Sequence, residues 1–201
     1  MLRLFPRFLT LFRLLMLLGL VVPLFAAFST PAAAQEWAIN KEKSRIMFEV
    51  DAGGQAFGGQ FDQFEAEIHF DRQHLDMTEI SAAIDMNTVN TGQSKVNDAL
   101  MGQEWFDTQT YPSAGFKATS ITAGTSENSY VLQGNLTIKG KTRPLTIPFI
   151  LAVDEGDANA KGETAISRRD FGIGPDGPVS GFVIGDLVKI KLDLFATRLD
   201  N

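Results

Sequence analysis

The 201-residue sequence contains no cysteine. This absence excludes disulfides, a thiol nucleophile, thiolate metal ligands and the lipid-modified cysteine of bacterial lipoproteins, so stability must come from packing. Only two histidines occur, His69 and His74, and they complete a zinc site only when carboxylates supply the other ligands. The G-x-S-x-G motif of serine hydrolases is missing as well. We therefore predict neither a metal site nor an enzyme.

An excess of basic residues is also missing. All 24 acidic residues, but only 15 of the 18 basic residues, follow residue 34, which gives that part of the chain a net charge of −9. Nucleic-acid binding requires a basic patch for the phosphates, so nucleic acid is not an expected partner. The same part has no second apolar run of membrane-spanning length, which is about 20 residues.

The first 34 residues have the pattern of a secretory signal peptide. Arg3, Arg7 and Arg13 precede an uncharged apolar run over residues 14–28, and alanines at 32–34 offer a small-residue cleavage site. The run of 15 residues is short for a membrane span. We predict cleavage after residue 34, a periplasmic location, and one domain over residues 35–201.

The clearest secondary-structure pattern lies in residues 130–153. Apolar and polar residues alternate from Tyr130 to Ile138 and again from Leu145 to Val153, which is the period of a strand with one buried face. A polar segment at 140–144 predicts the turn between them, so the stretch is a β-hairpin. Pro148 lies within the second strand and therefore requires an edge or bulge position.

Similar alternation predicts about eight strands in all, at 46–50, 64–70, 80–86, 114–121, 161–167 and 188–194 besides the hairpin. The alternation stops between residues 91 and 111. There Ser94 as an N-cap and Gly102 as a stop predict a short helix, followed by Trp105 and Phe106, which we expect to be buried over the end of a sheet. Many short antiparallel strands favour a barrel, because closure removes exposed edges.

Two loop segments invite a functional interpretation. Residues 172–177 have the spacing G-x-G-x-x-G, but Pro175 and Pro178 make the helix of a dinucleotide site implausible, so we predict a loop. Arg168, Arg169 and Asp170 form either an anionic headgroup site or a local Arg and Asp pair that holds the loop. Likewise, Lys95, Asn97 and Asp98 lie either at a portal or on a solvated helix face.

Several segments together resemble the YceI family of exported, lipocalin-like lipid-binding proteins, and they occur in the family's order over nearly all of the chain after residue 34. They are Trp37 with SRIMF at 44–48, GQFDQF at 59–64, TGQSKVNDAL at 91–100, WFD at 105–107, YPSAGF at 111–116, GNLTIKGKTRP at 134–144 and RRDFGI at 168–173. Many members have a His after the first long strand and an Arg-Asp-x-His-Leu run on the helix. Here those places hold residues 51–54 and 97–100, which brings the chain closer to the branch sometimes fused to a b-type membrane cytochrome.

The resemblance implies an all-β fold, an extended eight-stranded antiparallel lipocalin-like barrel with a short helical insertion. It also implies a long apolar lipid in the interior, such as a polyprenyl chain or a quinone, no other cofactor, and a membrane or membrane cytochrome as partner. We predict that lipid is contacted by eighteen apolar residues: Phe48, Val50, Phe57, Phe61, Phe64, Ile68, Ile84, Leu100, Trp105, Phe106, Phe116, Leu132, Leu136, Ile138, Ile147, Phe149, Val188 and Ile190.

Two other functions stay open at this point. In the first, the barrel is packed with side chains and serves as a structural or partner-binding domain, since eight strands enclose room for side chains or one small ligand. In the second, Asp98 or His69 acts as a general acid or base in a cavity, which would require burial and a shifted pKa. A cavity wide enough for a hydrocarbon chain would favour the lipid carrier.

Overall fold

The computed structural model describes residues 34–175, 177 and 183–199. The predicted signal peptide lies outside the described residues except for Ala34, so that prediction stays untested. None of the helices in the described ranges is both long enough and apolar enough to cross a membrane.

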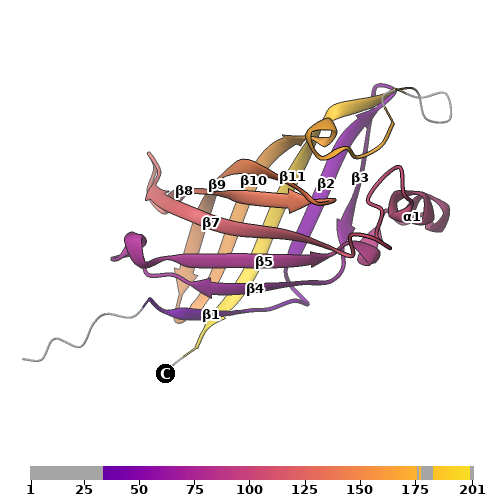
Figure 1. Cartoon of the computed structure of the whole chain (residues 1–201). Coiled ribbons are helices and arrows are strands. Elements are labelled where there is room, and N and C mark those ends of the chain that lie inside the picture. Colours follow the sequence, from indigo (N-terminus) through magenta and orange to yellow (C-terminus); the bar gives the residue numbers. More distant parts are fainter. Residues whose placement is uncertain (1–33, 176, 178–182, 200–201) are drawn as a thin grey trace, which may run out of the picture. The chain divides into compact units, whose positions relative to one another are not determined.

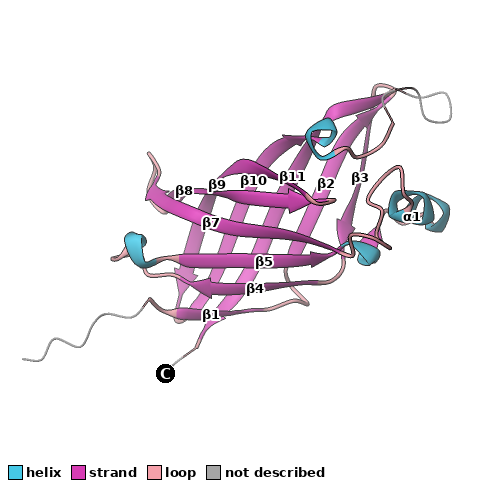
Figure 2. Cartoon of the chain, in the orientation of Figure 1, coloured by secondary structure: helices cyan, strands magenta, loops and turns pink. Residues whose placement is uncertain are grey.

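The strands carry the fold, and the helical segments lie at the strand ends (Figure 2). The helical segments are η1 (Leu75–Met77), η2 (Met86–Thr88), α1 (Ser94–Met101) and η3 (Arg168–Phe171). The strands are β1 (Glu36–Ile39), β2 (Arg45–Ala52), β3 (Gln55–Phe61), β4 (Phe64–His69), β5 (Glu79–Asp85), β6 (Val89–Asn90), β7 (Ser113–Ala123), β8 (Ser129–Ile138), β9 (Lys141–Asp154), β10 (Asp157–Ser167) and β11 (Ile184–Arg198).

All the described strands join one antiparallel sheet that closes on itself (Figure 1). The long strand β11 pairs with β10 on one side, and on the other side with β2 and then with β1. Strands β1 and β2 are two halves of one bent strand, and the same holds for β3 with β4 and for β5 with β6. The first bent strand pairs with the second through β1–β4 and β2–β3, and the second pairs with the third through β4–β5 and β3–β6. The result is a closed eight-stranded barrel, which confirms the predicted fold class.

The β8–β9 hairpin has the predicted alternation. Leu132, Leu136 and Ile147 are buried, whereas residues of the opposite face such as Gln133 and Thr146 are exposed. The predicted turn at 140–144 is wrong in extent, because β9 already begins at Lys141. The turn consists of Lys139 and Gly140 alone, with φ of 49° and 71°. Two central residues with positive φ match the twist of a hairpin, so a longer loop is unnecessary.

Strands β9 and β10 separate near the α1 end of the barrel. Their pairing ends at Phe149 and Gly162, so Pro148 lies on an edge and the edge prediction is confirmed. Thr164 Oγ1 donates to Thr146 O at 2.8 Å, which shows that the backbone N–H and C=O groups at even-numbered positions of β9 point toward β10. Prolines at 144 and 148 therefore supply no N–H on that side. The segment η3 packs against β9, β10 and β11 here, and its Phe171 is only 2% exposed.

The helix α1 follows β6 and lies beside one end of the barrel (Figure 1). Its N-cap is Gln93 and not the predicted Ser94, whereas Gly102 is the C-cap as expected. Asn97 is not a solvated helix residue: its Oδ1 accepts from the N–H of Thr91 at 2.9 Å and from the Thr91 hydroxyl at 2.7 Å. These bonds hold the helix to the segment that precedes it.

Candidate functional site

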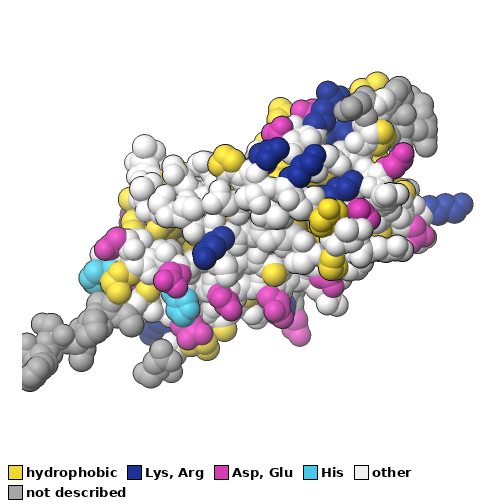
Figure 3. All heavy atoms as spheres, viewed as in Figure 1, with side chains coloured by type: hydrophobic (Ala, Val, Ile, Leu, Met, Phe, Trp, Pro, Cys, Tyr) yellow, Lys and Arg dark blue, Asp and Glu magenta, His cyan; other side chains and the backbone are white. Residues whose placement is uncertain are grey.

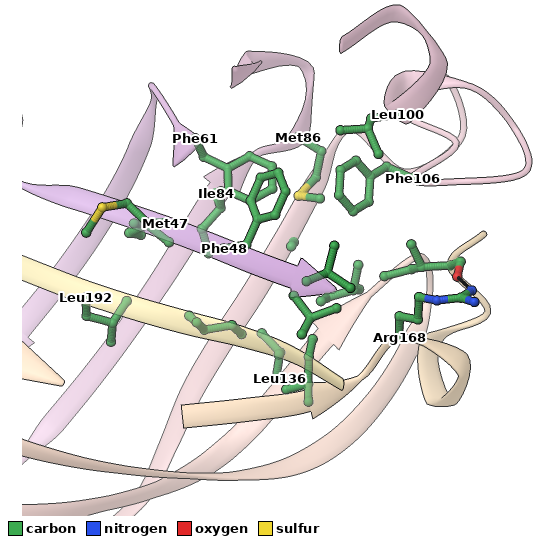
Figure 4. A pocket seen from close by; sticks show the side chains of 18 of the residues that line it. Met47, Phe48, Phe61, Ile84, Met86, Leu100, Phe106, Leu136, Arg168 and Leu192 are labelled. Atoms are coloured by element: carbon green, nitrogen blue, oxygen red, sulfur yellow. Dashed lines mark hydrogen bonds between the residues drawn. The ribbon is translucent and has the colours of Figure 1, made fainter. Parts of the chain in front are cut away.

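A cavity of about 740 Å³ lies inside the barrel toward the end that carries α1, η3 and the β2–β3 turn. Its walls come from strands around the barrel, and the side chains that surround it are nearly all hydrocarbon (Figure 4). Among the residues that the structure describes, the charged ones along it are Lys95 and Arg168. The volume is in the usual range for small-molecule sites, which is about 300 to 1,000 Å³.

A second cavity of about 120 Å³ lies farther along the barrel, and the described residues that line it are apolar side chains and Gly162. The two cavities meet at a set of shared side chains, which are Ile68, Ile80, Leu132, Ile147, Leu192 and Leu194. The interior is therefore hollow over much of its length, and it narrows away from α1.

Aromatic rings close the narrow end. The indole N–H of Trp37 donates to Phe70 O at 3.1 Å. The rings of Phe70 and Tyr130 meet edge to face at 5.6 Å, and Tyr130 stacks on Phe149 at 5.5 Å. The Tyr130 hydroxyl accepts from Arg72 Nε at 3.3 Å. Aromatic pairs of this geometry attract beyond their buried area, so this end is firmly packed.

The wide end is covered more loosely. Leu100 of α1 and Phe106 after it are buried over the opening, and the rings of Phe48, Phe61 and Phe106 form a tilted series at 5.7 and 5.8 Å. The wall formed by β2 and β3, which contains Phe48, is only half-buried. A cover made of one short helix and loops, over a half-exposed wall, is the weaker of the two closures.

The loop cover is fastened by hydrogen bonds to carbonyl groups. Lys139 Nζ donates to Gln103 O at 2.7 Å and to Gly172 O at 3.1 Å, and the Gly174 N–H donates to Glu104 O at 2.8 Å. Gly174 has φ of 72°, and a Cβ there would lie 2.8 Å from the Trp105 ring. A glycine is therefore required at 174 for both its backbone and its contact.

Arg168 is the most deeply buried charged residue along the cavity, at 3% exposed. Its Nε donates to Gly185 O at 3.0 Å, and its two terminal nitrogens donate to the carbonyls of Ile173, Pro175 and Ile184 at 2.8 to 3.2 Å. It does not pair with Asp170. The loop-holding interpretation is thus supported for Arg168, but through carbonyl groups. Arg169 instead lies 3.7 Å from Asp186.

Sixteen of the eighteen predicted contact residues line the large cavity. Phe149 lines the small one. Phe64 is buried at 4% exposed but is not among the residues that line either cavity. The structure thus brings these side chains together in the interior, and their contact with a lipid stays a prediction.

Sequence reasoning missed the small residues that leave the space. Ala66, Ala82 and Ala114 line the cavity, and Ala66, Ala82 and Phe116 lie side by side across β4, β5 and β7. The alternation in β4 and β5 already placed Ala66 and Ala82 on the inner face, so a signal existed. Met47 also lines the cavity, and the alternation gives no indication of this, because it assigns Met47 to the outer face.

The residues considered for acid–base chemistry lie elsewhere. Neither Asp98 nor His69 lines the large or the small cavity. The groups with shifted pKa values, Glu49, Asp71 and Lys191, do not line either cavity. Hydrogen bonding and charge from Lys191 lower the pKa of Glu49, and the His74 ring and the Gln73 N–H lower the pKa of Asp71. Within the described ranges no three His, Cys, Asp or Glu residues cluster as metal ligands.

Comparison with known proteins points to one family. A protein from Shewanella oneidensis described as a UPF0312 protein is 30% identical over 176 residues, covering 82% of this chain and 90% of its own. The crystal structure of BcnA from Burkholderia cenocepacia has a TM-score of 0.74 at 30% identity, covering 79% of this chain and 99% of its own.

A polyisoprenoid binding domain from Saccharophagus degradans has the same fold, with a TM-score of 0.64 at 16% identity over 82% of this chain and 99% of its own. The family model described as the YceI-like domain matches residues 37–196. The protein therefore belongs to the YceI-like domain family.

Proposed function

We propose that the protein binds one long apolar lipid, such as a polyprenyl chain or a quinone, inside the barrel, and that it carries or sequesters this lipid in the periplasm after export. The observation that carries the proposal is the 740 Å³ cavity with almost purely hydrocarbon walls. Protein interiors are normally filled to crystal-like density with few voids larger than a water molecule. A filled barrel acting as a structural domain does not account for so much open space.

Burial of the lipid chain supplies the binding energy. Each CH₂ group removed from water contributes about 0.8 kcal/mol, so a long hydrocarbon binds without any charged contact. The polyisoprenoid binding domain of Saccharophagus degradans supports this ligand class. A membrane cytochrome as partner stays a prediction that rests on the sequence resemblance alone.

The lining also favours one orientation of the ligand. The polar and charged lining residues of the large cavity, Gln55, Gln93, Lys95 and Arg168, all come from the β2–β3 hairpin, the α1 region and η3. No charged, amide or hydroxyl side chain of the described part of the chain lines the small cavity beyond. A polar head placed among apolar side chains would lose hydrogen bonds to water. The lipid therefore binds with its head toward α1 and its tail toward Trp37.

The test is to purify the protein without detergent, extract it with organic solvent and analyse the extract by mass spectrometry. We expect one lipid class at near-stoichiometric amount. The absence of any bound lipid, together with no uptake of an isoprenoid probe by the extracted protein, would contradict the proposal.

A pair of neighbouring alanines sharpens this test. Ala82 lines the cavity, whereas Ala83 on the same strand is exposed. Ala82→Trp fills part of the cavity, so it should reduce the extracted lipid strongly. Ala83→Trp adds the same ring on the outside and should leave the amount of lipid unchanged. Equal lipid content in the two variants would refute the assignment of the cavity.

A further inference from the structure

We propose that the α1 end of the barrel docks on the surface of a bilayer that contains anionic lipid. The inference rests on the proposed function, because a lipid carrier has to exchange its ligand with a membrane. Its own support is the arrangement of charge and exposed apolar side chains around the cavity opening.

Charged side chains are unevenly distributed on the barrel. On the face shown in Figure 3, Lys and Arg side chains gather toward the α1 end, where several Asp and Glu side chains also lie, and further Asp and Glu side chains follow the lower strands β4 and β5. Lys139 lies in the β8–β9 turn, Lys141 and Arg143 lie at the start of β9, and Lys95 lies on α1. Acidic residues also lie at this end, among them Asp98 in α1, Glu104 after it and Asp170 in η3, so the basic residues form a patch on one face and not an excess over the whole end.

These four basic residues are not neutralised within the protein. None of Lys95, Lys139, Lys141 and Arg143 is ion-paired with a carboxylate of the described residues. Several lysines elsewhere on the barrel are paired: Lys41 lies 3.2 Å from Glu65, Lys161 lies 3.4 Å from Asp193, and Lys191 lies 3.0 Å from Glu49. Lys139 is hydrogen-bonded to two carbonyl groups, so Lys95, Lys141 and Arg143 carry the basic charge that is available to an external anion.

Lys141 and Arg143 lie near the α1 end of the large cavity. Lys141 is paired with Ile138 and Arg143 with Leu136, and both partners line the cavity. Paired residues project to the same face of a sheet, yet Lys141 and Arg143 are exposed. Neither residue lines the cavity itself, so both lie beside its wall at the α1 end.

Exposed aliphatic side chains lie at the same end. Val183 is 66% exposed and Leu187 is 67% exposed. The Val183 carbonyl accepts from Gly53 N–H in the β2–β3 turn at 3.0 Å, and Leu187 is paired with Ser167, which precedes η3. Basic residues beside exposed aliphatic side chains are the combination that binds the interface of an anionic bilayer. The acidic residues on β4 and β5 would be repelled by the same surface, so the charge distribution orients the barrel.

The experiment is co-sedimentation with vesicles of phosphatidylcholine alone and of phosphatidylcholine mixed with phosphatidylglycerol. We expect binding to the mixed vesicles only, and loss of that binding at high salt. Each basic residue near an anionic surface changes the partition coefficient about fivefold. The double variant Lys141→Glu and Arg143→Glu should therefore reduce binding by about 25-fold or more.

A matched control places the same charge change elsewhere. Lys41→Glu and Lys43→Glu alter two exposed lysines between β1 and β2, and binding should stay within about twofold of the unchanged protein, because these residues lie away from the opening. Far-UV circular dichroism and the urea midpoint of both double variants establish that they fold. Equal loss in the control, equal binding to both vesicle types, or no vesicle binding at all would overturn the proposal. In the last case an acidic protein becomes the alternative occupant of the surface.

Measuring extracted lipid on the same samples separates the two proposals. Retained lipid without vesicle binding refutes docking and leaves the lipid-binding function intact. Vesicle binding by a protein that holds no lipid and takes up no isoprenoid probe supports docking and refutes the lipid-binding function.

Discussion

The two ends of the barrel are built from the same strands but are closed in different ways. At one end Trp37, Phe70, Tyr130 and Phe149 form a ring cluster with a hydrogen bond from indole to backbone, and only about 120 Å³ of space remains beside it. At the other end a short helix and loops cover a cavity of about 740 Å³. Dense aromatic packing supplies stability, whereas the loosely covered end leaves room for a ligand, so the difference separates a structural end from a binding end.

The largest effect is expected for a charge placed on the wall of the large cavity. Leu136→Glu should abolish lipid retention, because an ionised carboxylate in an apolar cavity would have to lose its water when hydrocarbon binds. Asn135→Glu is the matched control, since residue 135 is exposed on the outer face of the same strand. The readout is lipid in the solvent extract, with circular dichroism as the check on folding. A folded Leu136→Glu variant that keeps its lipid would show that this face is wrongly assigned.

The next prediction compares the substitution of an aromatic residue by alanine at each end of the barrel. Trp37→Ala should lower the free energy of unfolding by about 3 to 5 kcal/mol, because it leaves a cavity in packed surroundings and removes the donor to Phe70 O. Phe57→Ala removes a half-buried ring from the wall of the large cavity and should cost about 1 kcal/mol.

Urea unfolding of the protein freed of lipid measures both values. Removing the lipid first is necessary because a bound ligand raises the apparent stability. If the two substitutions lower the free energy of unfolding equally, the two ends are packed equally well, which would contradict the difference inferred from the ring cluster.

The smallest effect concerns the surface carboxylates near each end. The folded-state pKa values of Glu49 and Asp71 are lowered, first by the hydrogen bonds from Lys191 and His74 respectively. Each carboxylate therefore adds stability above the usual carboxyl pKa, and this stability is lost as the pH falls through the lowered folded-state value. Both side chains are partly exposed, Glu49 at 35% and Asp71 at 21%, so water screens the interactions and each contribution is small.

Glu49→Gln and Asp71→Asn should each reduce the urea midpoint slightly at neutral pH. Neither substitution should change the midpoint at a pH below both the folded-state and unfolded-state pKa values, where the carboxyl groups are already protonated. A difference that persists at low pH would mean that the substitution acts through packing and not through charge.

Particular residues show how far the sequence allows prediction. The alternation in residues 130–138 and 145–153 identified the buried side chains of β8 and β9, since burial of one strand face is a local property. Pro148 was expected on an edge and lies where β9 separates from β10. Ser94 and the turn at 140–144 were misplaced by one and by several residues, because element ends depend on tertiary contacts.

The role of Arg168 was less accessible to sequence reasoning. Its carbonyl partners include residues 16 and 17 positions away along the chain, and only the fold brings these groups around one guanidinium. The pattern Arg168, Arg169 and Asp170 suggested a local ion pair, whereas the structure uses the first arginine to hold a loop at the cavity.

The sequence by itself determined a barrel of alternating strands, because the inward or outward direction of each side chain follows from its position within a strand. Only the tertiary structure decided that the barrel is hollow toward α1 and closed toward Trp37. The hollow space is the volume left when the side chains of all strands meet across the barrel. It depends on register, as where Ala66 and Ala82 lie side by side, and no single strand contains that information.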